Sequence, residues 1–440
     1  MRVAVIGSGM SGSVAAVSLR AQGCDVVVFE RGEIGGRARV ADLDGVKVDV
    51  GAQFLTSFYA ETLSLLKSSG SDSDLLKISP SIGVSLDGRI RDLFGWRAVL
   101  GGSVLPWSAK VAIIPEVLLA LANWRSLSVQ ALWRSADLDS ASLSDAYART
   151  NGSRLLLERL VAPAIDNFLY WDPAETSRAL SPALVKGALI LRRMWTLQGG
   201  VGSLPAVLLS GMPVIAGSPV VSVREEKSTV LVQVANGQEE QFDGVVIATP
   251  ATSVPSLWGQ APKPVRDFLS AVNYSKTTVV SARLHRRVAS PTHGVMFPGG
   301  RDKLVAAVTV ASRRGSPELP SGEDIVQVFS TENAARKWQD LSDQDILESA
   351  GRALERIDDG ALDPRRGIGA LNVCRWDEAL PKFRPGYLRL LRDLQPWLES
   401  PGRVKIAGDY LSGPFIEGAV TTGKVAANAL VKEFGNPEMA

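Results

Sequence analysis

The chain has 440 residues, 45% of them hydrophobic and 21% charged, which is enough for two or three domains with substantial cores. Its 48 basic and 46 acidic side chains leave a net charge of +2, which gives no electrostatic case for a nucleic-acid partner. With only two cysteines and two histidines, neither a disulfide framework nor a His/Cys metal site is expected.

The N-terminal 30 residues predict a strand, a helix and a second strand. Residues 2–6 are apolar and β-branched, residues 11–22 carry apolar side chains at helical spacing, and residues 24–29 again read as a buried strand. Such a βαβ unit is the usual frame for binding a dinucleotide.

Glycines and one acid in this unit predict its ligand. Gly7 permits a tight turn, Gly9 lets the backbone approach a pyrophosphate, and Gly12 makes room where helix and strand touch. The helix start at Met10 and Ser11 offers N–H groups to phosphate oxygens, and Glu30 can accept hydrogen bonds from the ribose hydroxyls. We therefore expect a dinucleotide here.

A second glycine pair and an arginine follow the acid, at Gly35, Gly36 and Arg37. This spacing suits a dinucleotide larger than NAD, because the glycines let a loop fold over it and the arginine neutralises pyrophosphate charge. Together with the first motif, the stretch resembles the flavin-containing amine oxidase superfamily, whose members bind FAD. Further on, Asp49 to Phe54 reads as a short strand and turn, and the resemblance implies that Gly51 and Ala52 pass beside the flavin ring.

Residues 56–200 read as mostly helical. We expect a helix over 62–69, a hairpin over 82–93 with Asp87-Gly88 at its turn, and amphipathic helices over 106–170. The tryptophans of this layer, Trp107, Trp124 and Trp133, are expected in the core, with the wall of an apolar substrate channel as the alternative.

Residues 213–250 predict a compact β unit with a type I′ turn at Asn236-Gly237 and a buried strand over 245–248. The resemblance implies that backbone at Val220 meets the adenine. Residues 274–281 then predict a strand in which amine oxidases carry a lysine beside flavin N5. Our alignment places Thr278 there, with Lys276 two residues away on the same face.

The run from Trp376 to Gly386 resembles protoporphyrinogen-oxidase-like members of the superfamily, which usually have histidine where Tyr387 stands. No cysteine stands near Pro385 or Gly386, where some members bond flavin covalently, so FAD is expected to be non-covalent. The final stretch has Gly408-Asp409 and then Phe415 to Gly423 opening a helix to Phe434, which resembles the C-terminal flavin motif of the superfamily. The resemblance implies that Asp409 forms a hydrogen bond with the ribityl chain. It also implies that the N-terminus of the last helix points toward the flavin pyrimidine oxygen O2.

The resemblance implies two sets of site residues. Those beside the substrate are Tyr387, Phe415, Trp376 and Thr278. Those that hold FAD are Gly7, Gly9, Met10, Ser11, Gly12, Glu30, Arg31, Gly36, Arg37, Gly51, Ala52, Gln53, Phe54, Val220, Gly408, Asp409, Gly418, Ala419 and Val420.

We therefore predict an α/β protein with a Rossmann-type FAD-binding domain built from three separated segments, 1–78, 202–258 and 396–440. Residues 79–201 and 259–395 would form a substrate domain with a mixed sheet and helices.

The expected activity is transfer of a hydride from an apolar or cyclic small molecule to flavin N5, with molecular oxygen as the acceptor. The alternatives are an amine or amino-acid oxidase, and a non-enzymatic binding protein of the GDP-dissociation-inhibitor type.

The apolar run over 111–122 contains Pro115 and Glu116 and falls short of the roughly 20 residues that span a bilayer. Glycines interrupt the N-terminal apolar stretch, so it does not read as a signal peptide. We expect a cytoplasmic protein with peripheral membrane contact at most.

Overall fold

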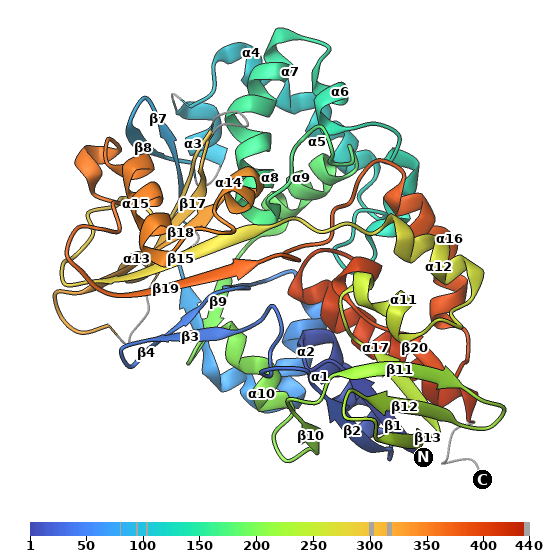
Figure 1. Cartoon of the computed structure of the whole chain (residues 1–440). Helices are drawn as coiled ribbons and strands as arrows, with labels where there is room; N and C mark the ends of the chain where they lie inside the picture. Colours follow the sequence, from blue (N-terminus) through green and yellow to red (C-terminus); the bar gives the residue numbers. More distant parts are fainter. Residues whose placement is uncertain (80, 94–95, 103, 299–302, 315–318, 435–440) are drawn as a thin grey trace.

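A computed structural model of the protein describes residues 1–440 apart from 80, 94–95, 103, 299–302, 315–318 and 435–440. Figure 1 shows a parallel sheet near the chain termini, a larger mixed sheet on the other side of the molecule, and a layer of helices above both.

The first sheet is parallel and collects its five strands from three distant parts of the chain, in the order β10-β2-β1-β14-β20. Its strands are β1 (Arg2–Ile6), β2 (Asp25–Phe29), β10 (Val214–Ile215), β14 (Gly244–Ile247) and β20 (Val404–Ile406). Helices α1 (Met10–Ala21) and α17 (Ile416–Glu433) pack on one face, where Val3, Ala15 and Leu430 are fully buried. The expected Rossmann-type domain built from three separated segments is confirmed.

A three-stranded antiparallel sheet covers the opposite face, with β11 (Val220–Glu225), β12 (Val230–Val234) and β13 (Glu239–Phe242). The type I′ turn predicted between β12 and β13 is wrong. That turn needs positive φ at both central residues, whereas Gly237 alone has one, at 87°. The Gly237 N–H instead donates to the Val234 carbonyl at 2.9 Å, which makes a longer turn.

The second sheet has seven strands in the order β19-β15-β18-β17-β16-β7-β8. They are β7 (Ile82–Leu86), β8 (Arg89–Asp92), β15 (Thr277–Leu284), β16 (Gly294–Met296), β17 (Val305–Val310), β18 (Asp324–Ser330) and β19 (Ile368–Trp376). The predicted hairpin at Asp87-Gly88 is confirmed, with φ of 53° and 75° at the two turn residues.

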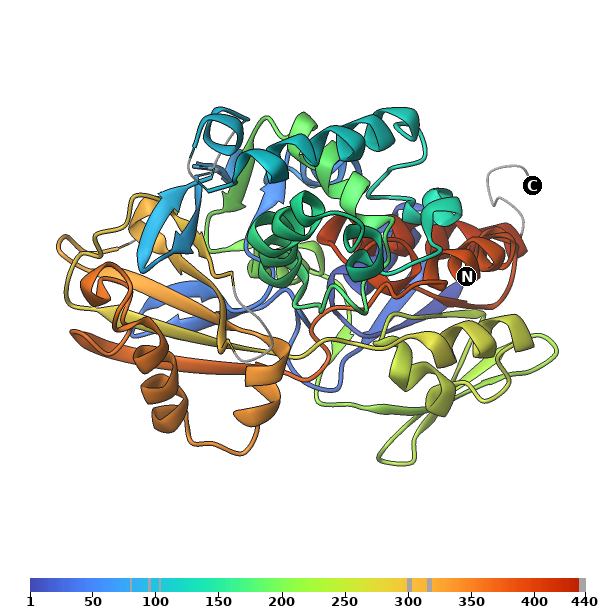
Figure 2. The same cartoon turned by 90° about the horizontal axis from the view of Figure 1, so that it is seen from above.

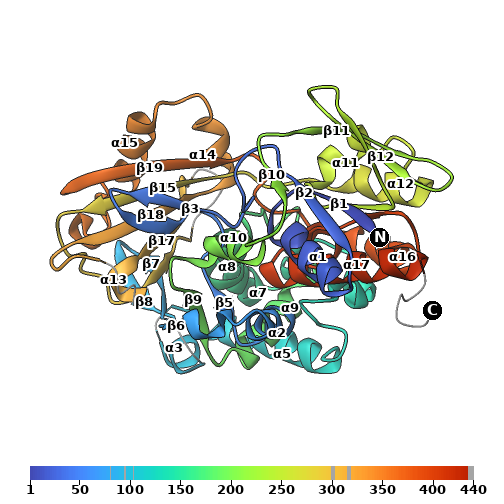
Figure 3. The same cartoon turned by 90° about the horizontal axis from the view of Figure 1, so that it is seen from below.

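Different elements cover the two faces of this sheet. Helices α14 (Glu332–Lys337) and α15 (Asp343–Leu354) pack on one face, against Val280, Ala282 and Val328. The hairpin of β3 (Val40–Leu43) and β4 (Val46–Asp49) packs on the other, against Val279, Phe329 and Cys374. Figure 3 shows β3 against β15 and β18.

The helical layer has the predicted character. Its helices are α2 (Ala60–Ser68), α3 (Trp96–Gly101), α4 (Trp107–Val111), α5 (Ile113–Ala122), α6 (Leu143–Tyr147), α7 (Asn151–Leu156), α8 (Ala162–Leu169) and α9 (Leu180–Ile190). Trp124 and Trp133 are half-buried, but Trp107 is 78% exposed, so the expectation of a core position is wrong for it. No helix of the described residues is long and apolar enough to cross a bilayer.

The remaining elements connect these layers. A small sheet joins β5 (Leu55–Thr56) and β6 (Leu75–Ile78) to β9 (Met194–Leu197). This pairing crosses the predicted boundary between residues 1–78 and 79–201, so the two predicted domains share a sheet there; their bounds stay a prediction. Helices α10 (Leu204–Leu208), α11 (Val254–Leu257), α12 (Lys263–Ala271), α13 (Ala311–Arg314) and α16 (Tyr387–Glu399) complete the fold.

Candidate flavin and substrate site

The turn between β1 and α1 accepts only glycine at two positions. Gly7 has φ of 100°, and a methyl group on Gly12 would lie 1.9 Å from the Gly7 carbonyl oxygen. Gly9 precedes α1 without a capping side chain, and the loop of Gly35 and Gly36 lies against it. The first turn of α1, with Met10 and Ser11, therefore offers backbone N–H groups to an anion, as the motif predicts.

Glu30 stands at the end of β2, directly beside this turn. Its carboxylate accepts hydrogen bonds from the Ser8 N–H at 2.9 Å, the Ser8 hydroxyl at 2.7 Å and the Gly32 N–H at 2.9 Å. The Glu30 carbonyl accepts from Ser218, which brings the start of β11 and Val220 to the same end of the sheet. Arg31 is exposed. These contacts fix the Glu30 carboxylate beside the turn, and its contact with a ribose stays a prediction.

Arg37 and Asp409 form a bidentate ion pair across 372 residues of sequence, with N···O distances of 2.8 and 2.7 Å. Arg37 also donates to the Ala379 carbonyl at 2.9 Å. Burial is the largest single effect and would lower the pKa of Arg37, but the Asp409 carboxylate together with Tyr274 and Glu378 outweighs it and raises that pKa. The residue predicted to contact phosphate and the residue predicted to contact the ribityl chain are thus paired with each other. The pair joins the first segment of the chain to the last.

The loop from Gly51 to Phe54 runs between the two large sheets. A methyl group on Gly51 would lie 2.0 Å from the Arg37 carbonyl oxygen, and the Ala52 N–H donates to that carbonyl at 3.3 Å. Gln53 donates to the Gln327 side chain at 2.7 Å, and Gln327 donates to the Ser281 hydroxyl at 2.9 Å. The loop is therefore held by side chains of the seven-stranded sheet.

Asp49, for which the sequence predicts no role, connects two parts of the site. Its carboxylate accepts from the N–H groups of Val201 at 3.1 Å and Gly202 at 2.7 Å, and Arg314 lies 4.0 Å away. Burial raises the pKa of Asp49 to about 6, against the lowering effects of Arg314 and of the two N–H groups. Asp49 thus joins β4 to the glycine-rich turn before α10. The signal available in the sequence was an acid inside an apolar strand.

The N-terminus of α17 also lacks a capping side chain. A methyl group on Gly418 would lie 2.1 Å from the Gly413 carbonyl oxygen, so this first turn requires glycine. Glu417 is buried there and accepts from the N–H groups of Glu61 and Thr62, at 2.8 and 2.9 Å, which holds α2 beside α17. Ala419 is half-buried and Val420 is buried. The Gly408 carbonyl accepts a hydrogen bond from the Thr422 hydroxyl at 3.1 Å. The uncapped turn offers N–H groups and a positive dipole end.

Two of the four residues predicted beside the substrate lie next to these elements. The Trp376 indole N–H donates to the Val50 carbonyl at 2.7 Å, and Arg39 lies over its ring. Phe415 directly precedes α17 and packs against Tyr59.

Tyr387 is elsewhere, and its predicted position beside the substrate is corrected. Its ring is 3% exposed, stacks on Phe383 at 4.5 Å between centroids and packs against Phe268. Its hydroxyl donates to the Tyr410 carbonyl at 2.7 Å. Both the face and the polar tip of the side chain are therefore occupied by core contacts at the start of α16.

Thr278 also lies away from the loop. Successive strand residues point to opposite faces, and Val280 and Ala282 pack against α14 and α15. Thr278 shares that face, whereas Val279 and Ser281 face β4 and the Gly51–Phe54 loop. Lys276 is paired with Asp377 at 2.6 Å. The predicted position of Thr278 beside the flavin is therefore corrected, because the alignment was one residue out of phase with the pleat.

Three aromatic side chains with no predicted role, Phe168, Tyr170 and Phe329, lie near Phe54 of this loop or on the sheet beside it. Phe54 packs edge-on against Phe168, and Tyr170 stacks on Phe329 of β18. Phe168 and Tyr170 lie at the end of α8, where Tyr170 takes a left-handed backbone conformation with φ of 56°. An aromatic pair at the end of a helix was visible in the sequence, but nothing local indicated which sheet it would face.

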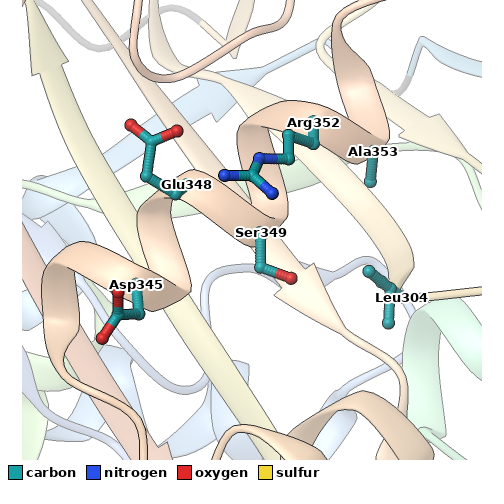
Figure 4. A pocket seen from close by; sticks show the side chains of 6 residues that line it. All are labelled: Leu304, Asp345, Glu348, Ser349, Arg352 and Ala353. Carbon is teal, nitrogen blue, oxygen red and sulfur yellow. The ribbon is translucent and has the colours of Figure 1, made fainter.

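A cavity of about 500 Å³ opens over α15 and is lined by Leu304, Asp345, Glu348, Ser349, Arg352 and Ala353. Figure 4 shows Leu304 facing that helix across the opening. Three of its polar groups already have partners: Glu348 pairs with Arg365, Asp345 with Ser342, and Ser349 with Trp338. Because α15 covers the sheet face opposite the Gly51–Phe54 loop, this cavity is separate from the flavin motifs.

A family model described as flavin containing amine oxidoreductase matches residues 10–431. The chain belongs to this family. Hydroxysqualene dehydroxylase of Sinorhizobium fredii is 25% identical over 98% of each chain. Coproporphyrinogen III oxidase of Mycobacterium tuberculosis is 26% identical over 97% of each. A structure of putrescine oxidase bound to putrescine superposes with a TM-score of 0.78, at 16% identity, over 98% of this chain and 99% of that one.

The protein is therefore an FAD-dependent oxidoreductase, and the non-enzymatic alternative does not hold. The described residues fit the cofactor. Two uncapped helix starts and the glycines that permit close backbone approach provide anion-binding surfaces. Beside Gly408, the buried Tyr410 hydroxyl has no hydrogen-bond partner among the residues that the structure describes. Glu30 and the pair of Arg37 with Asp409 would contact the ribose and the phosphate side.

Proposed function

We propose that this enzyme oxidises a carbon of an apolar or cyclic small molecule and passes the electrons to molecular oxygen. FAD, when bound, supplies the chemistry by accepting a hydride at N5. The protein's own residues then have to position the substrate, exclude water and stabilise the negative charge that develops on the ring.

One observation carries this proposal: the side chains that the sheet itself turns toward the Gly51–Phe54 loop are uncharged, and the cations nearby are held by the Cys374 sulfur (Arg39) and by Asp49 (Arg314). These side chains are Val279, Ser281, Gln327, Phe329 and Cys374, and the lysine of amine oxidases has no counterpart among them. Lys276, which directly precedes β15, is held by Asp377 instead. Such a face suits a substrate recognised by shape and apolar contact rather than by its charge.

Each neighbouring element has a defined role in the proposal. Gln53, Gln327 and Ser281 hold the loop, so that its backbone is fixed against the ring system. Trp376, Phe415 and the Phe54–Phe168 pair would shield the substrate from water. The uncapped first turn of α17 stabilises negative charge by its N–H groups and dipole.

The names of two relatives agree with this substrate class. One is named for hydroxysqualene, an apolar molecule, and another for coproporphyrinogen III, which is cyclic but carries carboxylates. The fold alone is shared with putrescine oxidase, which binds an amine.

The test is anaerobic reduction of the bound flavin, followed by its absorbance, with a porphyrinogen, an isoprenoid and a set of primary amines as candidates. The proposal expects bleaching by the porphyrinogen or the isoprenoid, and return of the oxidised spectrum on admitting oxygen. Bleaching by amines alone would overturn it and make the protein an amine oxidase. Flavin that stays reduced after oxygen is admitted would contradict the proposal that oxygen is the electron acceptor.

A further inference from the structure

Helices α4 and α5 carry a continuous row of exposed apolar side chains. Trp107, Val111, Ile114, Leu118 and Leu121 follow one another at spacings of four, three, four and three residues, which places them on one helical face. All five are exposed, Trp107 at 78% and Leu118 at 60%. We call these five residues the α4–α5 stripe. Figure 2 shows the two helices, cyan to teal, along the rim of the molecule.

The sequence that contains the stripe is basic. Between Asp92 and Asp137 the sequence holds four basic residues and a single acid, Glu116. Glu116 is buried and neutralised by Arg178 at 2.7 Å. Helix α5 packs on α9, where Lys186 donates to the Trp124 carbonyl at 2.7 Å.

The end of this helix pair adds more positive charge. Arg125 follows α5, and Arg192 and Arg193 follow α9; all three side chains are exposed. Leu189, on the last turn of α9, is exposed as well. An apolar row bordered by arginines, with the local acid removed from the surface, is complementary to anionic lipid headgroups over a hydrocarbon layer.

We propose that the α4–α5 stripe docks the enzyme on the surface of an anionic membrane, with the stripe in the headgroup boundary and the arginines on the lipid phosphates. A tryptophan at the exposed end of the stripe is the side chain that favours this boundary. A second copy of the chain is a poorer occupant, because five side chains fall well short of the roughly 20–30 residues a side of a standard protein interface.

The docking surface connects to the flavin site through the segment that follows α5. Gln130 donates to Glu417, in the first turn of α17, at 2.7 Å, and its carbonyl accepts from Ser412 at 2.6 Å. If the proposed function holds, this surface would bring the enzyme to apolar substrates dissolved in the bilayer. The docking itself does not depend on that function.

The test is flotation of the FAD-loaded enzyme with two kinds of vesicle, phosphatidylcholine alone and phosphatidylcholine with phosphatidylglycerol. We expect binding to the anionic vesicles, weakened by high salt because the arginines contribute. In the double variant Leu118→Glu/Leu121→Glu, membrane partitioning should fall by at least about tenfold. Leu390→Glu, at a leucine of α16 that is 42% exposed, is the matched control and should bind as the wild type does.

Flavin absorbance and circular dichroism of each variant show that it is folded before flotation. Failure of the wild type to float with either vesicle overturns the proposal, as does an equal loss in Leu390→Glu. A dimer in solution that Leu118→Glu/Leu121→Glu dissociates also overturns it, because a second copy would then cover the stripe. None of these results depends on turnover, so they stand apart from the test of substrate class.

Discussion

Arg37 and Asp409 show how one pair of residues can serve both the fold and the cofactor. The Asp409 side chain is 6% exposed, and both of its carboxylate oxygens accept from Arg37. Bidentate pairing fixes the guanidinium plane, so the remaining donors of Arg37 point in set directions. We expect these donors to reach the phosphates of FAD.

Arg37→Ala should lower both the flavin content and the stability of the purified protein. Leaving Asp409 buried without a partner costs about 3 kcal/mol. Flavin absorbance per protein and the melting temperature measure the two effects. Arg283→Ala breaks a similarly buried pair, with Glu323, away from the cofactor motifs and should keep its flavin. If Arg37→Ala/Asp409→Ala regains full flavin content, the pair serves only the fold.

Asp49 gives a pH dependence whose direction follows from its pKa. Burial raises that pKa to about 6 in the folded protein, from 3.8 for an ordinary aspartate. Between these values the folded state binds the proton more tightly than the unfolded state, so the contribution of Asp49 to stability falls as pH rises. The full change is about 3 kcal/mol.

The stability difference between the wild type and Asp49→Asn should therefore shift in favour of the wild type as pH falls from 7 to 5. Melting temperatures of the two proteins across this range measure the difference, because the contributions of the other carboxylates are the same in both proteins and cancel. Asp72→Asn, at an exposed acid, should give a difference that is flat with pH. A flat difference for Asp49→Asn would show that the carboxylate is not desolvated as its burial indicates.

At the scale of the element, the pleat of β15 decides which side chains face the Gly51–Phe54 loop. Thr278 and Val280 belong to the face covered by α14 and α15, while Val279 and Ser281 belong to the face that meets the cofactor loop. A shift of one residue in an alignment therefore moves a side chain to the other face.

Lys276→Met should leave both flavin half-reactions unchanged within about twofold, because the variant removes only a partly exposed ion pair. Stopped-flow absorbance of reduction and of reoxidation measures the two steps. Lys263→Met, which removes the surface pair with Asp267, is the matched control. A large loss of oxygen reactivity in Lys276→Met alone would restore the amine-oxidase lysine to this position.

Tyr387, at the start of α16, is expected to affect stability, whereas the sequence predicted that it contacts the substrate. Tyr387→Phe loses the hydrogen bond to the Tyr410 carbonyl and should cost about 1 kcal/mol of stability. The rate of flavin reduction should stay at the wild-type value, whereas Phe415→Ala should lower it, since Phe415 directly precedes α17. Urea unfolding and anaerobic stopped-flow separate the two. Slowed reduction in Tyr387→Phe without lost stability would return Tyr387 to the substrate site.

At the scale of the whole molecule, the motifs predicted to hold the flavin come together from three distant segments, and both cysteines are buried in contacts of their own. Cys24 is buried among residues of β1, β2 and α1 on the outer face of the parallel sheet. Cys374 lies under the β3–β4 hairpin, where its sulfur receives a hydrogen bond from Arg39 at 3.4 Å. We therefore propose that FAD is held by non-covalent contacts alone.

Acid precipitation should accordingly release all of the flavin into the supernatant. Fluorescence of the supernatant and of the redissolved pellet measures the distribution, and a second precipitation after proteolysis checks for trapped cofactor. Flavin that remains on a peptide would contradict the proposal and identify its attachment site.

The sequence by itself determined the parts of this protein that are encoded locally. Gly7, Gly12 and Glu30 lie within one βαβ unit, where steric limits and strand–helix periodicity operate over a few residues. The hairpin at Asp87-Gly88 and the uncapped start of α17 are of the same kind. The order of these motifs along the chain was enough to predict the cofactor and the fold class.

Only the tertiary structure decided which distant side chains meet. The pair of Arg37 with Asp409, the contact of Gln53 with Gln327 and the burial of Asp49 each join segments more than 150 residues apart. Local periodicity does not fix which face of a helix or strand is buried. The tertiary packing therefore decides whether Tyr387 and Thr278 face the core or the site, and whether Trp107 is exposed. The physical reason is that packing selects one face of an element only after its neighbours are in place.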